Sequence, residues 1–168
     1  VGFRFWGGTW TYQSLIIAHD IENVTIEGEG TIEGRGGSFP VQSKKKPDKY
    51  RDRPYLLWFA NSRNINITGI ELRNSAMWMQ SYIRCDQLKI DGVRIFNHSN
   101  LNNDMMDIDG CRDVIITRVT GDSDDDGITF KSTCDRMSEN IIVSDCLLSS
   151  HCNALKFGTE TTAGFKNV

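Results

Sequence analysis

The feature that most constrains the fold is a short phrase that recurs along the chain. Each copy opens on Asn, Gln or Asp and then alternates apolar with mostly polar residues. The copies occupy 23–28, 64–69, 87–92, 113–117 and 140–144, and the opening residue returns at Asn167. The steps between opening residues are 41, 23, 26, 27 and 27. Alternation with a period of two is typical of a strand with one buried face.

A second expected strand precedes most copies of the phrase. These segments are 57–59, 80–82, 106–108, 128–130 and 155–157. Two or more short strands in each repeat of about 25 residues, without a helical pattern between them, predict a β-solenoid. We therefore predict an all-β fold, a right-handed parallel β-helix with a partial set of coils, in which residues 1–168 form a single domain. An antiparallel β-sandwich is disfavoured because two-residue hairpin signals are scarce.

The first repeat is longer than the others because it contains the polar, basic stretch 38–53. We interpret this stretch as a loop insertion thrown out of one coil. Two readings stay open for it. The loop is either a solvated excursion or one rim of a substrate cleft, since loops on a rigid scaffold often carry function.

Charge and composition narrow the classes of partner. The net charge of −3 argues against nucleic acid, which prefers a basic face. No apolar run is long enough for a transmembrane helix, so no membrane association is expected. The five cysteines form no CxxC pair, so we expect no zinc site, no cofactor and mostly buried free thiols. We expect a monomer.

Registering the coils brings carboxylates together. When 106–109 is aligned with 128–131, a step of 22, Asp104 falls level with Asp126. Asp125 lies beside Asp126 at the start of the same strand. The next coil places 153–157 in the same column, with His151 just ahead of it.

Alternation along these strands separates an inner from an outer face. Met106 and Ile128 share the inward parity with the other apolar residues of the column, including Leu155 and Phe157. Asp107, Lys131 and Lys156 share the outward parity and predict a polar ladder beside the acid cluster. A solvated surface with salt bridges shows the same pattern, so this alternative stays open.

Three crowded carboxylates suit glycosidic cleavage. This reaction needs one protonated acid for the leaving oxygen and one ionised carboxylate to activate water or attack carbon. Crowding of like charges separates the pKa values, so that one group stays protonated near neutral pH. The alternative for the acidic run 122–126 is a calcium site or an acidic surface turn.

Three segments, in order, carry a family resemblance: Asn102-Asn103-Asp104, Asp124-Asp125-Asp126 and Ser150-His151-Cys152. With the early stretch 28–34, they resemble the motifs of glycoside hydrolase family 28, the polygalacturonase and rhamnogalacturonase family. Those motifs read Asn-Thr-Asp-Gly, Gly-Asp-Asp, Gly-His-Gly and Gly-x-Gly-Thr-Ile-Asp-Gly. This sequence departs from them where Met105, Asp124, Ser150 and Cys152 replace glycines. The segments 53–54, 78–80 and 151–160 resemble bacterial members in particular.

The resemblance implies an inverting hydrolase that acts on a pectic polysaccharide, either galacturonan or rhamnogalacturonan. By carry-over, Asp125 is the general acid, while Asp104 and Asp126 hold and activate the water. His151 then tunes or orients the acid and binds substrate. The expected substrate-binding residues are Asn102, Asp107, Lys131 and Lys156.

The fourth family motif, Arg-Ile-Lys, has no counterpart after His151. We therefore expect a fragment of a bacterial member, truncated at both ends of the solenoid. Replacement of the missing cation pair by Lys131 or Lys156 is a disfavoured alternative. The family also implies a secreted or periplasmic protein involved in pectin degradation, although the sequence shows no signal peptide. Two alternatives remain: a polysaccharide lyase on a similar β-helix, and a non-catalytic carbohydrate-binding β-helix that uses Trp58 and Trp78 as stacking platforms.

Overall fold

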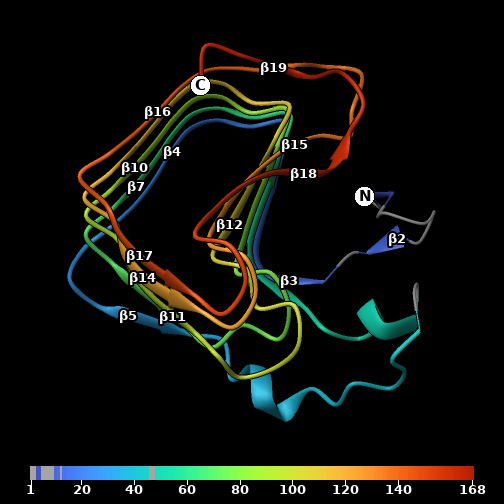
Figure 1. Ribbon diagram of the computed structural model, residues 1–168. Coiled ribbons are helices and arrows are strands. Elements are labelled where there is room, and N and C mark those ends of the chain that lie inside the picture. The colour runs from blue at the N-terminus through green and yellow to red at the C-terminus, as the bar shows by residue number, and fades with distance from the viewer. Residues whose placement is uncertain (1–2, 5–9, 12, 46–47) are drawn as a thin grey trace.

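The computed structural model describes residues 3–4, 10–11, 13–45 and 48–168, and their main body is a parallel β-helix. Viewed along the axis, the strands of successive coils superimpose into three sides (Figure 1). Each side is a parallel sheet, and we name the sheets after their strands β12, β13 and β14. The predicted fold class is confirmed, and each coil contributes three strands rather than the two that the sequence pattern shows most clearly.

In each of the three sheets, neighbouring strands come from successive coils of the chain. The β12 sheet contains β3 (Ser14–His19), β6 (Tyr55–Ala60), β9 (Gln80–Ile83), β12 (Met106–Asp109), β15 (Ile128–Ser132) and β18 (Leu155–Thr161). The β13 sheet contains β4 (Glu22–Glu27), β7 (Arg63–Thr68), β10 (Asp86–Asp91), β13 (Arg112–Thr117), β16 (Ser138–Ser144) and β19 (Phe165–Lys166). The β14 sheet contains β5 (Thr31–Glu33), β8 (Glu71–Arg73), β11 (Arg94–Asn97), β14 (Thr120–Ser123) and β17 (Leu147–Ser150). Two short antiparallel strands, β1 (Phe3–Arg4) and β2 (Trp10–Thr11), lie ahead of them.

The opening residue of each phrase has a structural reason for its identity. The backbone there is left-handed, with positive φ at Asn23, Asn64, Gln87, Asp113, Asn140 and Asn167. Among residues with a Cβ, Asn and Asp tolerate this conformation best. The side chains also form a ladder, since Asn64 Nδ2 donates to Asn23 Oδ1 at 2.7 Å and Asn140 Nδ2 donates to Asp113 Oδ1 at 3.0 Å. The phrase therefore marks a stacked bend in the backbone.

This bend yields a stability prediction at Asn64, which is exposed and has a φ of 52°. We expect Asn64→Val to lower the free energy of unfolding by about 1–2 kcal/mol, because a β-branched residue is strained at positive φ. Asn64→Gly, the matched control, removes the same amide without that strain and costs less. Urea denaturation measures both. If both variants lost the same free energy of unfolding, the cause would be the missing side-chain ladder and not backbone strain.

The inside of the solenoid is apolar, as the alternation predicts. Leu57, Ile67, Ile90, Ile108 and Ile116 are fully buried there with the other inward residues of their sheets. Two inward residues of the last coil that the structure describes are exceptions. Leu155 and Phe157 are 52% and 56% exposed, because β18 is the last strand of its sheet and no further coil covers its inner side.

The outer face of the β12 sheet differs from the predicted ladder. All side chains of β6, β12 and β15 are buried. An outer aromatic layer covers this face, made of Tyr50, Tyr55, Trp58, Ala60 and Met77 with Trp78 and Ile83 packed against it. Parity predicts which side a residue faces but does not predict what then packs over that side.

The loop insertion at 38–53 supplies part of this outer layer. Its end contains the short 3-10 helix η2 (Asp48–Tyr50), and both Tyr50 and Arg53 are buried. An earlier 3-10 helix, η1 (Gly36–Ser38), leads into the loop. The loop thus docks on the solenoid at one corner, and it is not a purely solvated excursion (Figure 1).

The cysteines only partly follow the expectation. All five are free thiols, but only Cys85 and Cys111 are buried, whereas Cys152 is exposed. Among the described residues, no helix has the length and apolar character that crossing a membrane requires.

Candidate active site

The predicted carboxylate cluster forms at the corner that joins the β14 sheet to the β12 sheet. Met106 pairs with Ile128 and Asp109 with Lys131, which confirms the step of 22. The amide of Met105 donates to the carbonyl of Asp126 at 2.9 Å, so Asp104 and Asp126 occupy neighbouring levels. Both of their side chains are buried, whereas Asp125 is half-buried. We call Asp104, Asp125 and Asp126 the carboxylate trio.

Asp126 is held as a carboxylate by two side chains from the next coil. Lys156 Nζ donates to its Oδ2 at 2.6 Å, and Asn153 Nδ2 donates to its Oδ1 at 2.7 Å. Burial opposes ionisation, yet these bonds from Lys156 and Asn153 keep the pKa of Asp126 below its usual value. Asp126 is therefore an ionised member of the trio.

Asp104 has the opposite electrostatic environment. Burial raises its pKa well above the usual value, and the charges of Asp107, Asp125 and Asp126 add to this effect. Its Oδ1 is buried and accepts no hydrogen bond from the described residues. A proton on Asp104 relieves both problems, so the trio combines a protonated with an ionised carboxyl group.

Asp125 is oriented by a relay that begins in the loop insertion. Asn102 Nδ2 donates to Asp125 Oδ2 at 3.2 Å, and the guanidinium of Arg53 donates to Asn102 Oδ1 at 3.2 Å. The hydroxyl of Ser150 fixes the backbone by donating to the carbonyl of Asp125 at 2.6 Å. The relay places Asn102 in the site, as predicted, and adds Arg53, which the sequence analysis did not single out.

Asp107 and Lys131, expected to bind substrate on an outer polar face, are instead covered. Their residues are 1% and 5% exposed. Lys131 Nζ lies 2.7 Å from Glu160 Oε2 and 3.5 Å from Asp107 Oδ1, and it sits 4.7 Å from the ring centroid of Trp78. Because both residues are buried, they act on the trio through their charges, which influence the pKa of Asp104. Lys156, by contrast, keeps a partly exposed side chain beside Asp126.

The buried Asp107 makes stability depend on pH. Burial raises its pKa to about 7, although Lys131 opposes the shift. A carboxyl group whose pKa is higher in the folded state stabilises the fold below its unfolded pKa, and this contribution is lost as pH rises toward 7. Since one pKa unit corresponds to about 1.4 kcal/mol, we expect Asp107→Asn to gain on the order of 2 kcal/mol relative to wild type between pH 4.5 and 7.5.

Urea unfolding across this pH range tests the Asp107 prediction. The exposed Asp145, also at positive φ, gives a matched control because Asn fits the same backbone. Asp145→Asn should follow the wild-type pH dependence. Parallel curves for Asp107→Asn and wild type would contradict the prediction.

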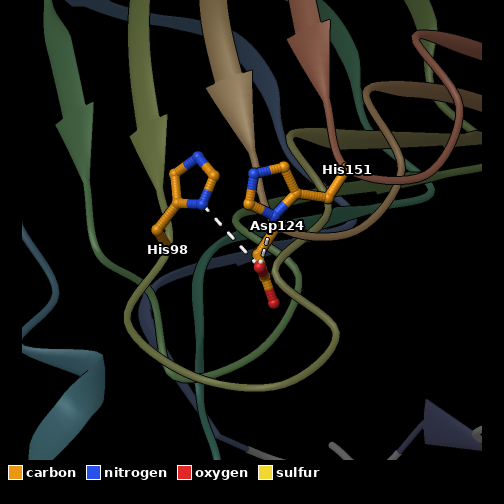
Figure 2. Close-up of side chains that lie close together, drawn as sticks. All are labelled: His98, Asp124 and His151. Carbon is orange, nitrogen blue, oxygen red and sulfur yellow. Dashed lines mark hydrogen bonds and ion pairs between the residues drawn. The ribbon is translucent and has the colours of Figure 1, made fainter.

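His151 reaches the corner as predicted, but the side chain that it pairs with is Asp124. Its Nδ1 lies 2.9 Å from Asp124 Oδ1, and the imidazole of His98, next to that of His151, places its Nδ1 3.8 Å from the same oxygen (Figure 2). Within the described residues, two groups place possible metal ligands within 4.8 Å of one another. One is His98, Asp124 and His151, and the other is Asp125, Asp126 and Cys152.

Asn153 and Glu160 are further residues that the sequence analysis missed. Asn153 directly follows the third motif, and its stacking on Gly127 in the predicted column puts it beside Asp126. Glu160 lies in the long strand β18, whose register shifts relative to β15 after Phe130, and this irregularity lets it reach Lys131. Stacking alone gives a signal for Asn153 but none for Glu160.

Comparisons with known proteins show which family the chain is similar to. The model of the family "Glycosyl hydrolases family 28" matches residues 3–152. A protein of Vitis vinifera named "Probable polygalacturonase" is 28% identical over 167 residues, covering 94% of this chain and 34% of the relative. Endo-xylogalacturonan hydrolase A of Aspergillus tubingensis is 24% identical over 170 residues, covering 98% of this chain and 41% of the relative.

A solved structure shows the same architecture. The crystal structure of a hyperthermoactive exopolygalacturonase from Thermotoga maritima matches with a TM-score of 0.79 and 25% identity, covering 100% of this chain and 48% of that chain. The chain thus spans about a third to a half of the length of these relatives. Because the family model covers most of the sequence, including all three motifs around the trio, this chain belongs to glycosyl hydrolases family 28.

Proposed function

We propose that this protein hydrolyses a glycosidic bond of a pectic polysaccharide, either a galacturonan or a rhamnogalacturonan. The observation that carries the proposal is the carboxylate trio itself. Asp126 is kept ionised by Lys156, while the buried Asp104 has a raised pKa. A protonated and an ionised carboxyl group side by side are the two components that glycosidic hydrolysis requires.

We assign Asp125 as the general acid because it is the member of the trio that is only half-buried and so faces an arriving leaving group. In this role Asp125 delivers a proton to the leaving oxygen. Asp126 takes a proton from the attacking water, and Asp104 holds this water. The bond from the anomeric carbon to the leaving oxygen breaks as the bond to the water oxygen forms.

The other polar residues of the corner serve binding and orientation in this proposal. Asn102 and Lys156 contact the substrate, and the exposed His151 binds it while helping to orient Asp125. Asp107 and Lys131 act from behind the trio, since they are buried. A polymeric substrate also implies that the protein acts outside the cytoplasm, because polysaccharides of this size do not enter a cell.

The anomeric outcome is part of the proposal and comes from the family resemblance. Inverting enzymes usually separate their carboxyl groups by about 6.5–9.5 Å. Carboxylate oxygens of Asp125 and Asp126 approach within 4.8 Å, so the spacing of this pair alone does not argue for inversion. The stereochemistry of the first product therefore has to be measured.

The test is product analysis on a panel of pectic polysaccharides, with NMR of the anomeric configuration formed first. We expect new reducing ends and, from an α-linked substrate, a β product. An α product would overturn the inverting mechanism. An unsaturated product that absorbs in the ultraviolet and disappears with a chelator would replace the hydrolase by a lyase. Sugar binding without turnover would leave a carbohydrate-binding β-helix.

A further inference from the structure

Three residues of the same corner form a separate ladder along the solenoid axis. Asn97 pairs with Ser123, and Ser123 pairs with Ser150, in the parallel register of β11, β14 and β17. The next residue in each coil is therefore His98, Asp124 and His151, one above another. The amide of Asp124 donates to the carbonyl of Asn97 at 3.0 Å, and the amide of His151 donates to the carbonyl of Ser123 at 3.0 Å.

The side chains of this ladder converge on one point. Both imidazole rings are directed toward the carboxylate of Asp124 (Figure 2). Oδ1 of Asp124 lies 2.9 Å from Nδ1 of His151 and 3.8 Å from Nδ1 of His98. Two ligand atoms on one tetrahedral zinc ion, each bonded at about 2.0–2.1 Å, lie about 3.3 Å apart. The two observed separations lie on either side of this value.

The residues around His98 are arranged as they are around a metal-binding histidine. Nε2 of His98 is buried, neither donates nor accepts a hydrogen bond among the described residues, and lies 3.3 Å from Oδ2 of Asp122. Phe96 packs against the ring, with centroids 4.9 Å apart. A carboxylate behind the second ring nitrogen fixes the orientation and tautomer of a metal-bound histidine. The Asp122–His98 pair supplies this arrangement before any ion binds.

We propose that His98, Asp124 and His151 bind a transition-metal dication of the Zn²⁺ class. The imidazole nitrogens and one carboxylate favour such an ion over Ca²⁺ or Mg²⁺, which take oxygen ligands. Three protein ligands leave one position for water or a substrate oxygen. Asp124 occupies the position at which the family motif has glycine. The complete set of three ligands is therefore a feature of this sequence and not of the shared motif.

Binding engages His151, which the proposed function also uses. If that function holds, Zn²⁺ inhibits hydrolysis by withdrawing His151 from the substrate. Metal binding itself does not depend on activity, so a calorimetric measurement stands whether or not the hydrolase proposal survives.

The experiment is calorimetric titration of the untagged, EDTA-treated protein with Zn²⁺. We expect one ion per chain, loss of binding by more than about tenfold in both His98→Ala and Asp124→Gly, and weakening by about 10–100-fold in Asp122→Asn. His19→Ala is the matched control, because His19 is the third histidine and pairs with Asp20 and Asn61 elsewhere. That control should bind as wild type does.

Several results would overturn the proposal. These are a wild-type dissociation constant weaker than about 1 mM, unchanged binding in both His98→Ala and Asp124→Gly, or equal affinity for Ca²⁺. Cys152→Ser separates the neighbouring group formed with Asp125 and Asp126. Loss of binding in Cys152→Ser with retention in His98→Ala would move the ion to that group. Thermal unfolding of each metal-free variant shows that the fold is intact, and Asp122→Asn keeps the test open if a ligand variant fails to fold.

Discussion

Asp125→Asn is expected to lower kcat for pectic polysaccharide hydrolysis by about 10³-fold, with KM changed far less. The amide keeps one oxygen and the shape of the side chain but has no proton of suitable acidity for the leaving group. An interaction made only in the transition state lowers kcat and kcat/KM together. Steady-state kinetics on the best substrate of the panel measures this loss.

The fold should survive this substitution. Asp125 accepts hydrogen bonds from Asn102 and from the amide of Asp126, and an Asn oxygen retains one of them. We therefore expect a change in the free energy of unfolding of about 1 kcal/mol at most. Asp145→Asn, on an exposed turn away from the trio, serves as the control and should keep full turnover. A folded Asp125→Asn protein with wild-type kcat would rule out Asp125 as the acid.

Arg53→Met should destabilise the protein by about 3 kcal/mol. The Arg53 side chain is fully buried and its guanidinium donates to the carbonyls of Ala76 and Leu101 and to the side chains of Asn100 and Asn102. Each buried acceptor left without a donor costs about 1–3 kcal/mol, and local relaxation recovers part of the sum. Arg53→Lys should lose less but not recover fully, because an ammonium group cannot reproduce the planar fork.

The control lies two residues away in the same loop. Arg51 is exposed and pairs with Asp48 at 2.7 Å, so Arg51→Met should change stability by less than about 0.5 kcal/mol. Denaturant unfolding compares the variants. If Arg53→Met fell within the same range as Arg51→Met, the loop insertion would not be anchored by this residue. Because Arg53 also holds Asn102, a folded Arg53→Lys protein should show a shifted pH profile of kcat.

The sequence predicted the parts of the site that depend on strand register. A step of 22 between two paired strands is enough to bring Asp104 level with Asp126, and a step of 27 to the next coil puts His151 one coil further on. His98 and Asp124 are aligned by a different step, 26 residues, which is set by the register of the third strand of each coil. Short strands such as Thr120–Ser123 contain too few alternating residues to stand out from a loop.

What the sequence did not predict depends on the packing of loops and irregular strands. Arg53 lies in a stretch whose basic, polar composition is typical of a solvated loop. It is buried because its guanidinium donates hydrogen bonds to oxygen atoms of residues that are 23 to 49 positions further along the chain. Asp107 and Lys131 have the outward parity of a surface ladder. Trp78 and Glu160 pack against Lys131, whose ammonium group lies 3.5 Å from Asp107, and none of these contacts follows from a period of two.

At the corner between the β14 and β12 sheets, the length of the connecting segment varies while the register of the strands does not. At this corner the chain inserts 34–54 between β5 and β6 in one coil but only 124–127 between β14 and β15 in another. Both coils nevertheless keep their strands in register with their neighbours. The length of chain at this corner can therefore change the walls around a bound polymer while the carboxylates stay at fixed heights, about 4.8 Å per coil. Substrate choice and bond cleavage can then diverge independently within one architecture.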